Sequence, residues 1–140
     1  MLQYFSADWI FPVNAPPIKN GVVVTKENGK VVNLLTENES KDLNLKKYNG
    51  AIVPGFINTH CHLELSHMLG QIPEKTGLVE FVKRIIKSRQ SSEQQITSAI
   101  EFADKQMFNN GIVAVGDISN QSISKETKLK SNIYYHTFVE

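Results

Sequence analysis

The feature that most constrains the fold is an alternation of short apolar runs with helical segments after residue 50. The runs Ala51–Val53 and Phe56–His60 are separated by Pro54 and Gly55. In Leu78–Ile86, apolar residues then recur at helical spacing. Strands that alternate with helices predict βαβ units and a parallel sheet.

The pattern continues to the end of the chain. A second helix is predicted from a serine cap at 91–92 to the Asn-Gly stop at 110–111. Buried-type strands are predicted over Ile112–Ser119 and Ile133–Val139, and residues 121–131 are polar and receive no assignment. Residues 51–140 are therefore expected to form an α/β unit.

The first fifty residues are typical of β-structure instead. Two Val-rich runs, Val22–Thr25 and Val31–Leu35, lie on either side of Asn28 and Gly29. Asn-Gly supplies the positive φ angles of a tight turn, which predicts a hairpin. From Thr36 to Asn49 the chain becomes polar and charged, so we expect one unit over 1–50 and another over 51–140.

Composition excludes several classes of function. The net charge is +1 and no basic stripe occurs, which argues against nucleic acid or an anionic membrane as the partner. A single cysteine cannot form an internal disulfide. The N-terminus lacks the features of a signal peptide, and no apolar run reaches the length of a membrane helix. We expect a cytoplasmic protein.

Three of the four histidines lie in PGFINTHCHLELSH, residues 54–67. Because side chains alternate along a strand, Phe56, Asn58, His60 and His62 are predicted to share one face, with Cys61 on the other. Neighbouring imidazoles can both bind one zinc-like ion, and such sites form beyond the carboxyl ends of parallel strands. This pattern makes His60 and His62 candidate metal ligands.

Other interpretations of these residues stay open at this point. The two histidines could simply cap a strand and bond nearby carbonyls, and a catalytic metal normally needs three protein ligands. Glu64 is a third candidate by spacing. His67 is assigned to the loop after the strand and His136 to a strand core. The metallo-β-lactamase and cupin patterns fit the stretch less well.

The segment VPGFINTHCHLELSHMLGQIPEKTGLVEFVKRII resembles the amidohydrolase superfamily, in the branch of cytosine, guanine and nucleoside deaminases and chlorohydrolases. GIVAVGDIS and IYYHTFVE resemble the second and third strands of the family's (β/α)8 barrel. The resemblance implies an α/β fold in which residues 51–140 form the first strands and helices of the barrel. Residues 1–50 would form part of a small β-sandwich.

The same resemblance implies a function. His60 and His62 would bind a divalent metal, with zinc expected, and Glu64 would contact the substrate. The complete protein would be a metal-dependent hydrolase of C–N bonds that deaminates a purine-like or related heterocycle through metal-bound hydroxide. The continuation after His62 is similar to the branch that contains aminodeoxyfutalosine deaminase. Chlorinated heterocycles and cyclic amides stay open as substrates.

The family's remaining ligands are two histidines from the fifth and sixth strands and an aspartate after the eighth. Asp117, at the end of the second strand, is not that aspartate by position. The chain is therefore expected to resemble the N-terminal third of the enzyme, without assigned acid or base groups and inactive alone. The alternative is a non-catalytic fragment or a binding or partner chain. Exposed strand edges would favour a homo-oligomer.

Overall fold

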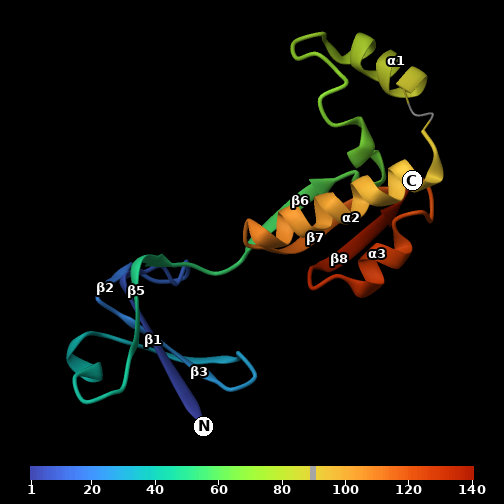
Figure 1. Ribbon diagram of the computed structural model, residues 1–140. Helices are drawn as coiled ribbons and strands as arrows, with labels where there is room; N and C mark the ends of the chain where they lie inside the picture. The colour runs from blue at the N-terminus through green and yellow to red at the C-terminus, as the bar shows by residue number, and fades with distance from the viewer. Residues whose placement is uncertain (89–90) are drawn as a thin grey trace. The chain divides into compact units, whose positions relative to one another are not determined.

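The computed structural model describes residues 1–88 and 91–140, which form two compact units, Met1–Pro54 and Gly55–Glu140 (Figure 1). The first unit continues beyond residue 50 because the strand β5, Lys46–Ile52, pairs with β1, Leu2–Ile10. The run Ala51–Val53 therefore follows the sheet of the first unit rather than that of the second.

The first unit is built around one five-stranded sheet with β1 at its centre. β1 pairs in antiparallel fashion with two strands, β2 and β3, and in parallel with β5. Its core contains Ala7, Ile10 and Val23, against which Ile18, Leu34 and Ile52 pack. The remaining elements are β2 (Ile18–Lys19), β3 (Val22–Lys26), β4 (Val31–Leu35) and the short 3-10 helix η1 (Asn38–Ser40).

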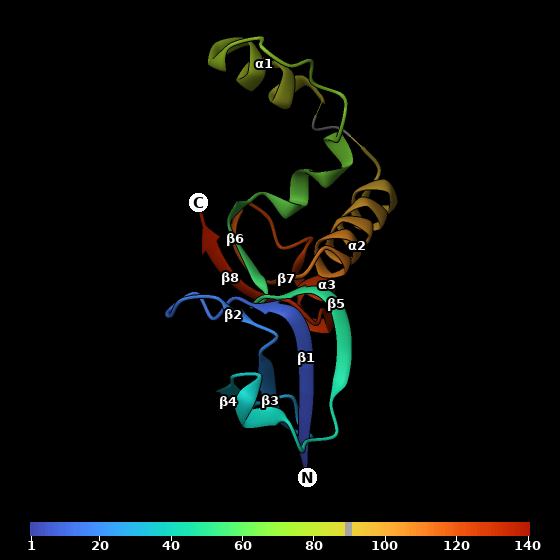
Figure 2. The same ribbon diagram turned by 90° about the vertical axis from the view of Figure 1, so that its left-hand side faces the viewer.

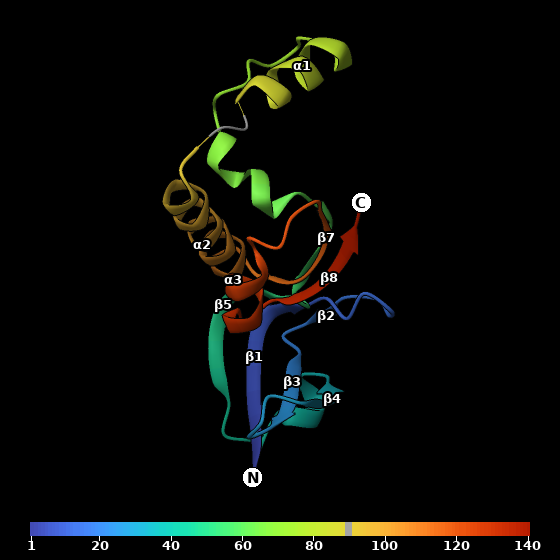
Figure 3. The ribbon, with the colours of Figure 1, turned by 90° about the vertical axis from the view of Figure 1, so that its right-hand side faces the viewer.

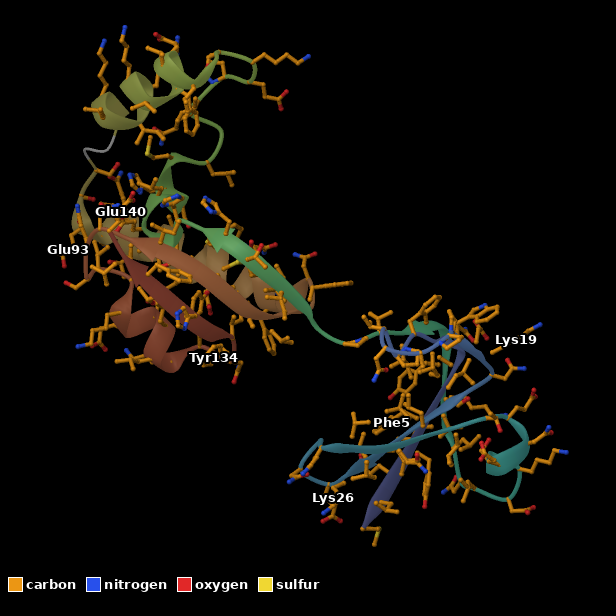
Figure 4. The ribbon with its side chains drawn as sticks, turned by 180° about the vertical axis from the view of Figure 1, so that it is seen from behind. Phe5, Lys19, Lys26, Glu93, Tyr134 and Glu140 are labelled. Carbon is orange, nitrogen blue, oxygen red and sulfur yellow. The ribbon has the colours of Figure 1, made fainter. Side chains whose placement is uncertain are left out.

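The predicted hairpin is confirmed, with a different turn. β3 and β4 pair antiparallel, and the N–H of Gly29 donates to the carbonyl of Lys26 at 2.9 Å. Gly29 has a φ of 81°, whereas Asn28 keeps a negative φ. The loop is thus a turn followed by one left-handed glycine, a common alternative to the two-residue turn. Lys26, labelled in Figure 4, marks where β3 enters it.

The second unit has the predicted βαβαβ order. Its sheet is parallel throughout, with strand order β6-β7-β8. The residues left unassigned by sequence contain a short helix, α3. In chain order the elements are β6 (Phe56–Cys61), the 3-10 helix η2 (Leu63–Met68), α1 (Leu78–Ser88), α2 (Glu93–Asn109), β7 (Ile112–Ser119), α3 (Lys125–Lys130) and β8 (Tyr134–Val139).

Helices α2 and α3 lie on the same side of this sheet, as Figures 2 and 3 show from opposite directions. From α2, the carboxylate of Asp104 accepts a hydrogen bond from the hydroxyl of Tyr135 at 2.7 Å. From α3, the Nζ of Lys128 donates to the hydroxyl of Thr137 at 3.1 Å. Among the described residues, α2 and α3 therefore cover one face of the sheet, and the opposite face is the open face.

The helix predicted over Leu78–Ile86 is confirmed as α1. Its apolar stripe, which the spacing predicted as core, is exposed: Leu78 is 77% accessible and Ile86 67%. The prediction of burial is wrong for this chain, because the described residues leave that stripe uncovered. Arg89, expected among the basic residues at the end of this helix, lies outside the described residues. No helix within the described residues is long and apolar enough to cross a membrane.

The start of α2 is set by a capping box at Ser92. Its hydroxyl accepts the N–H of Gln95 at 3.3 Å, and the Gln95 side chain accepts the N–H of Ser92 at 3.1 Å. Ser92→Ala should lower the free energy of unfolding by about 0.5–2 kcal/mol, because the backbone N–H of Gln95 loses its hydroxyl acceptor at the helix start. Urea denaturation followed by circular dichroism measures the loss.

Ser98→Ala is the matched control, since Ser98 lies exposed in the middle of the same helix. Alanine has the higher helix propensity there, so stability should hold or rise slightly. An equal loss in both variants would mean that the cap does not set the start of α2.

Candidate metal site

The site begins with an irregularity in the pairing of β6 with β7. Asn58 lies opposite Val115 and Cys61 opposite Asp117, so β6 uses one residue more than β7 between these positions. Such a bulge shifts the alternation of side chains. The amide of Asn58 accordingly lies 3.9 Å from the sulfur of Met107 on the helix-covered side. The prediction that Asn58 shares a face with His60 is wrong for this reason.

Gly116 makes room for the bulge. A Cβ at this position would lie 2.9 Å from the carbonyl oxygen of Thr59 and 3.5 Å from the ring of Phe138. A backbone atom cannot move aside as a flexible side chain can, so only glycine fits without a shift of the strand. The glycine of the apolar run 112–119 therefore permits the close approach of β6 at the level of the histidines.

His60 and His62 lie together on the face of the sheet opposite the helices. Cys61 between them is directed toward Asp117, which is buried beneath the helices, so the two imidazoles point the other way. Their ring centroids are 5.1 Å apart, with planes inclined at 74°. The side-chain carbonyl of Asn58 accepts the N–H of His60 at 3.3 Å. The geometry therefore allows both imidazoles to bind one metal ion at the end of the strand.

Glu64 lies beyond the pair, at the start of η2, and is buried. Its Oε2 accepts the backbone N–H groups of Asn120 and Gln121 at 3.2 and 3.0 Å, and the hydroxyl of Ser119 at 3.3 Å. The carboxylate therefore ties the segment after β6 to the segment after β7. Sequence spacing alone could not give this direction, because the backbone turns into η2 at this point.

The other two histidines take different positions. His67 lies beyond β6, as expected, and its Nδ1 is 3.2 Å from the carbonyl of Glu64. His136 is exposed on β8, opposite Gly116, with its ring edge-on to Phe138 at 4.7 Å. The prediction of a core position for His136 is therefore wrong. Among residues 1–88 and 91–140, no three His, Cys, Asp or Glu side chains come together as a metal cluster.

Sequence reasoning missed a buried charged network centred on Asp117. This side chain is 0% exposed, and its Oδ1 accepts the N–H of Leu63 at 2.7 Å. Its Oδ2 forms an ion pair with Lys128 at 2.5 Å, and Lys128 is only 11% exposed. The one available signal was an acidic residue in the apolar run 112–119. Its partner Lys128 lies in the stretch that received no assignment.

The network changes the chemistry of Cys61. Burial, together with the nearby negative charge of Asp117, raises the pKa of the thiol from 9.0 to about 11. Burial and the neighbouring Asp104 also raise the pKa of Tyr135. A pKa in this range keeps the Cys61 thiol protonated at neutral pH, in agreement with a packing role.

The sequence profile of the amidohydrolase family matches residues 51–133. This match covers more than half of the chain and includes β6, both histidines and Asp117. The chain belongs to the amidohydrolase family. No curated protein sequence matches it.

Solved structures share its fold. Helicobacter pylori aminofutalosine deaminase, in complex with methylthio-coformycin, is 21% identical with a TM-score of 0.77; the alignment covers 98% of this chain and 35% of that one. Guanine deaminase from C. acetobutylicum, with bound guanine, is 16% identical with a TM-score of 0.76, covering 98% and 36%. A mutant atrazine chlorohydrolase from Arthrobacter aurescens, complexed with zinc and atraton, is 15% identical with a TM-score of 0.71, covering 96% and 34%. The chain thus spans about a third of the length of these structures.

The raised pKa of Cys61 can be measured directly, because it is the single cysteine. Alkylation by iodoacetamide needs the thiolate, so its rate should keep rising by about tenfold per pH unit up to a pH near 11. In urea the alkylation rate of the same thiol should level off near its ordinary pKa of 9.0. A folded chain whose rate levels off at the same pH as the unfolded chain would contradict the buried position of the thiol beside Asp117.

Proposed function

We propose that the protein carrying this chain is a metal-dependent hydrolase of C–N bonds. The observation that carries the proposal is the histidine pair, His60 and His62, on the open face at the end of the first parallel strand. Membership of the amidohydrolase family supports it. Sites beyond the carboxyl ends of parallel strands are the usual position for chemistry in such folds.

The donors fit a divalent metal as two of its ligands. Imidazole nitrogens bind zinc at about 2.0–2.1 Å, and two rings at adjacent positions of one strand face can bind a single ion. We propose zinc, since a solved structure of the same fold is a complex with zinc. When bound, such an ion supplies an acidified water, with its pKa lowered toward about 7. The remaining ligands would come from residues outside the 140 of this chain.

The chain's own residues would hold and shape this site. The side chain of Asn58 fixes the N–H of His60, and Gly116 leaves the space beside the bulge open. We also propose that Glu64 contacts the substrate. Its carboxylate holds the Asn120–Gln121 segment, which lies at the same end of the sheet as the histidines. Small-molecule substrates would approach from the open face.

We propose deamination of a purine-like or related heterocycle as the reaction. Two solved structures of the same fold are deaminases, one with guanine bound. Because a third structure of this fold is an atrazine chlorohydrolase, a chlorinated heterocycle is the second candidate substrate. For the fold, we propose that the second unit is the first portion of a (β/α)8 barrel and that the first unit is one sheet of a β-sandwich. A cytoplasmic location stays a prediction.

The metal assignment makes a direct prediction for the full-length gene product. Replacing His60 or His62 with Asn should abolish both bound metal and turnover, because each removes one of the proposed ligands. Elemental analysis measures the metal per chain. His67→Asn is the matched control and should keep both, since the Nδ1 of His67 is engaged with the carbonyl of Glu64. Metal and turnover retained by the His60→Asn protein would contradict the proposal.

The reaction is tested by ammonia release from a panel of purine bases, nucleosides and chlorinated triazines. We expect ammonia from at least one amino-substituted purine, and none from the His62→Asn protein. Chloride release from a triazine without ammonia from any purine would favour the second candidate substrate. A protein that binds panel members and hydrolyses none would favour the alternative of a non-catalytic binding chain.

A further inference from the structure

The carboxylate of Asp117 holds the peptide unit that directly follows His62. The N–H of Leu63 belongs to the peptide that follows His62, and it donates to Oδ1 of Asp117 at 2.7 Å in a buried setting. At His62 the backbone leaves the strand, with φ −125° and ψ 75°. The orientation of that peptide is coupled to ψ of His62. A hydrogen bond on it therefore restrains the backbone at His62, from which the imidazole projects.

The carboxylate is itself held from two further elements. Its Oδ2 is paired with Lys128 of α3 at 2.5 Å, and Lys128 also donates to Thr137 of β8. The start of η2, just after β6, is thus joined to β7 and β8 by one network, which is buried at Asp117 and exposed at Thr137. Such a pair contributes little net stability, because desolvation of both charges offsets their attraction. What the network provides is a fixed position for Oδ1.

We propose that Asp117 is a positioning residue that sets the His62 imidazole beside His60 for metal binding. The inference rests on the proposed function, since it assigns the network to the metal pair. Asp117 lies on the opposite side of the sheet from both rings and acts only through the Leu63 amide. Residues that orient ligands from outside the coordination sphere commonly change metal affinity by about 10–100-fold when replaced.

The test uses two double variants of the full-length gene product. Asp117→Asn with Lys128→Met removes both charges and keeps an oxygen acceptor for the Leu63 amide. Asp117→Leu with Lys128→Met removes the charges and the acceptor at similar volume. Replacement of a buried ion pair by apolar residues is often tolerated, so both variants should fold. Circular dichroism and urea denaturation check this.

Zinc affinity, measured by competition with a chelator, is the first readout. We expect the Asn-containing variant to bind zinc almost as tightly as the wild type, and the Leu-containing variant to bind about 10–100-fold more weakly. The visible absorption of the cobalt(II)-loaded protein is the second readout. It reports ligand geometry, and it should change only in the Leu-containing variant. A purely structural role would lower stability without altering this spectrum.

Asp104→Ala is the matched control, because Asp104 accepts hydrogen bonds from Ser131 and Tyr135 on the same covered side. It should lose stability and keep zinc affinity. Equal zinc affinity in the two double variants, or an equal loss in Asp104→Ala, would overturn the positioning role. If His60→Asn also keeps its zinc, the metal site itself fails. If only the Asp117 comparison fails, the metal site stands and this inference falls.

Discussion

The shifted pairing of β6 with β7 is the constraint on which the candidate site depends. One extra residue between Asn58 and Cys61 places Asn58 and Cys61 on the same, helix-covered side. The histidines on either side of Cys61 then share the open face. Gly116 permits this bulge, because it has no side chain to meet the carbonyl of Thr59. A single glycine in β7 is therefore required for the arrangement of residues on the neighbouring strand.

Beneath the open face, charge rather than apolar packing connects the strand ends. Asp117 is buried and Lys128 is only 11% exposed, and their contacts reach η2, α3 and β8. Glu64 makes a second connection, from the segment after β6 to the segment after β7. The carboxylate of Asp117 thus holds the backbone just after β6, and that of Glu64 holds the backbone just after β7. Contacts of this kind hold the backbone beside the proposed metal ligands in place, which a metal site requires.

Sequence reasoning predicted the elements of this chain better than it predicted their side-chain directions. Spacing and capping residues located α1, α2 and β7, because local propensities decide those elements. Alternation failed at Asn58, because a bulge depends on the partner strand, which a single-strand pattern does not contain. The Asp117–Lys128 pair was missed for a similar reason. Its two members are brought together by tertiary structure, and α3 is too short for a periodic signal.

Anomalous diffraction from crystals of the zinc-loaded, full-length gene product tests the central claim most directly. We predict a zinc peak on the face of the sheet opposite α2 and α3. One nitrogen from each of His60 and His62 should lie about 2.0–2.1 Å from it. A zinc peak bound elsewhere, with these two imidazoles outside the coordination sphere, would contradict the account.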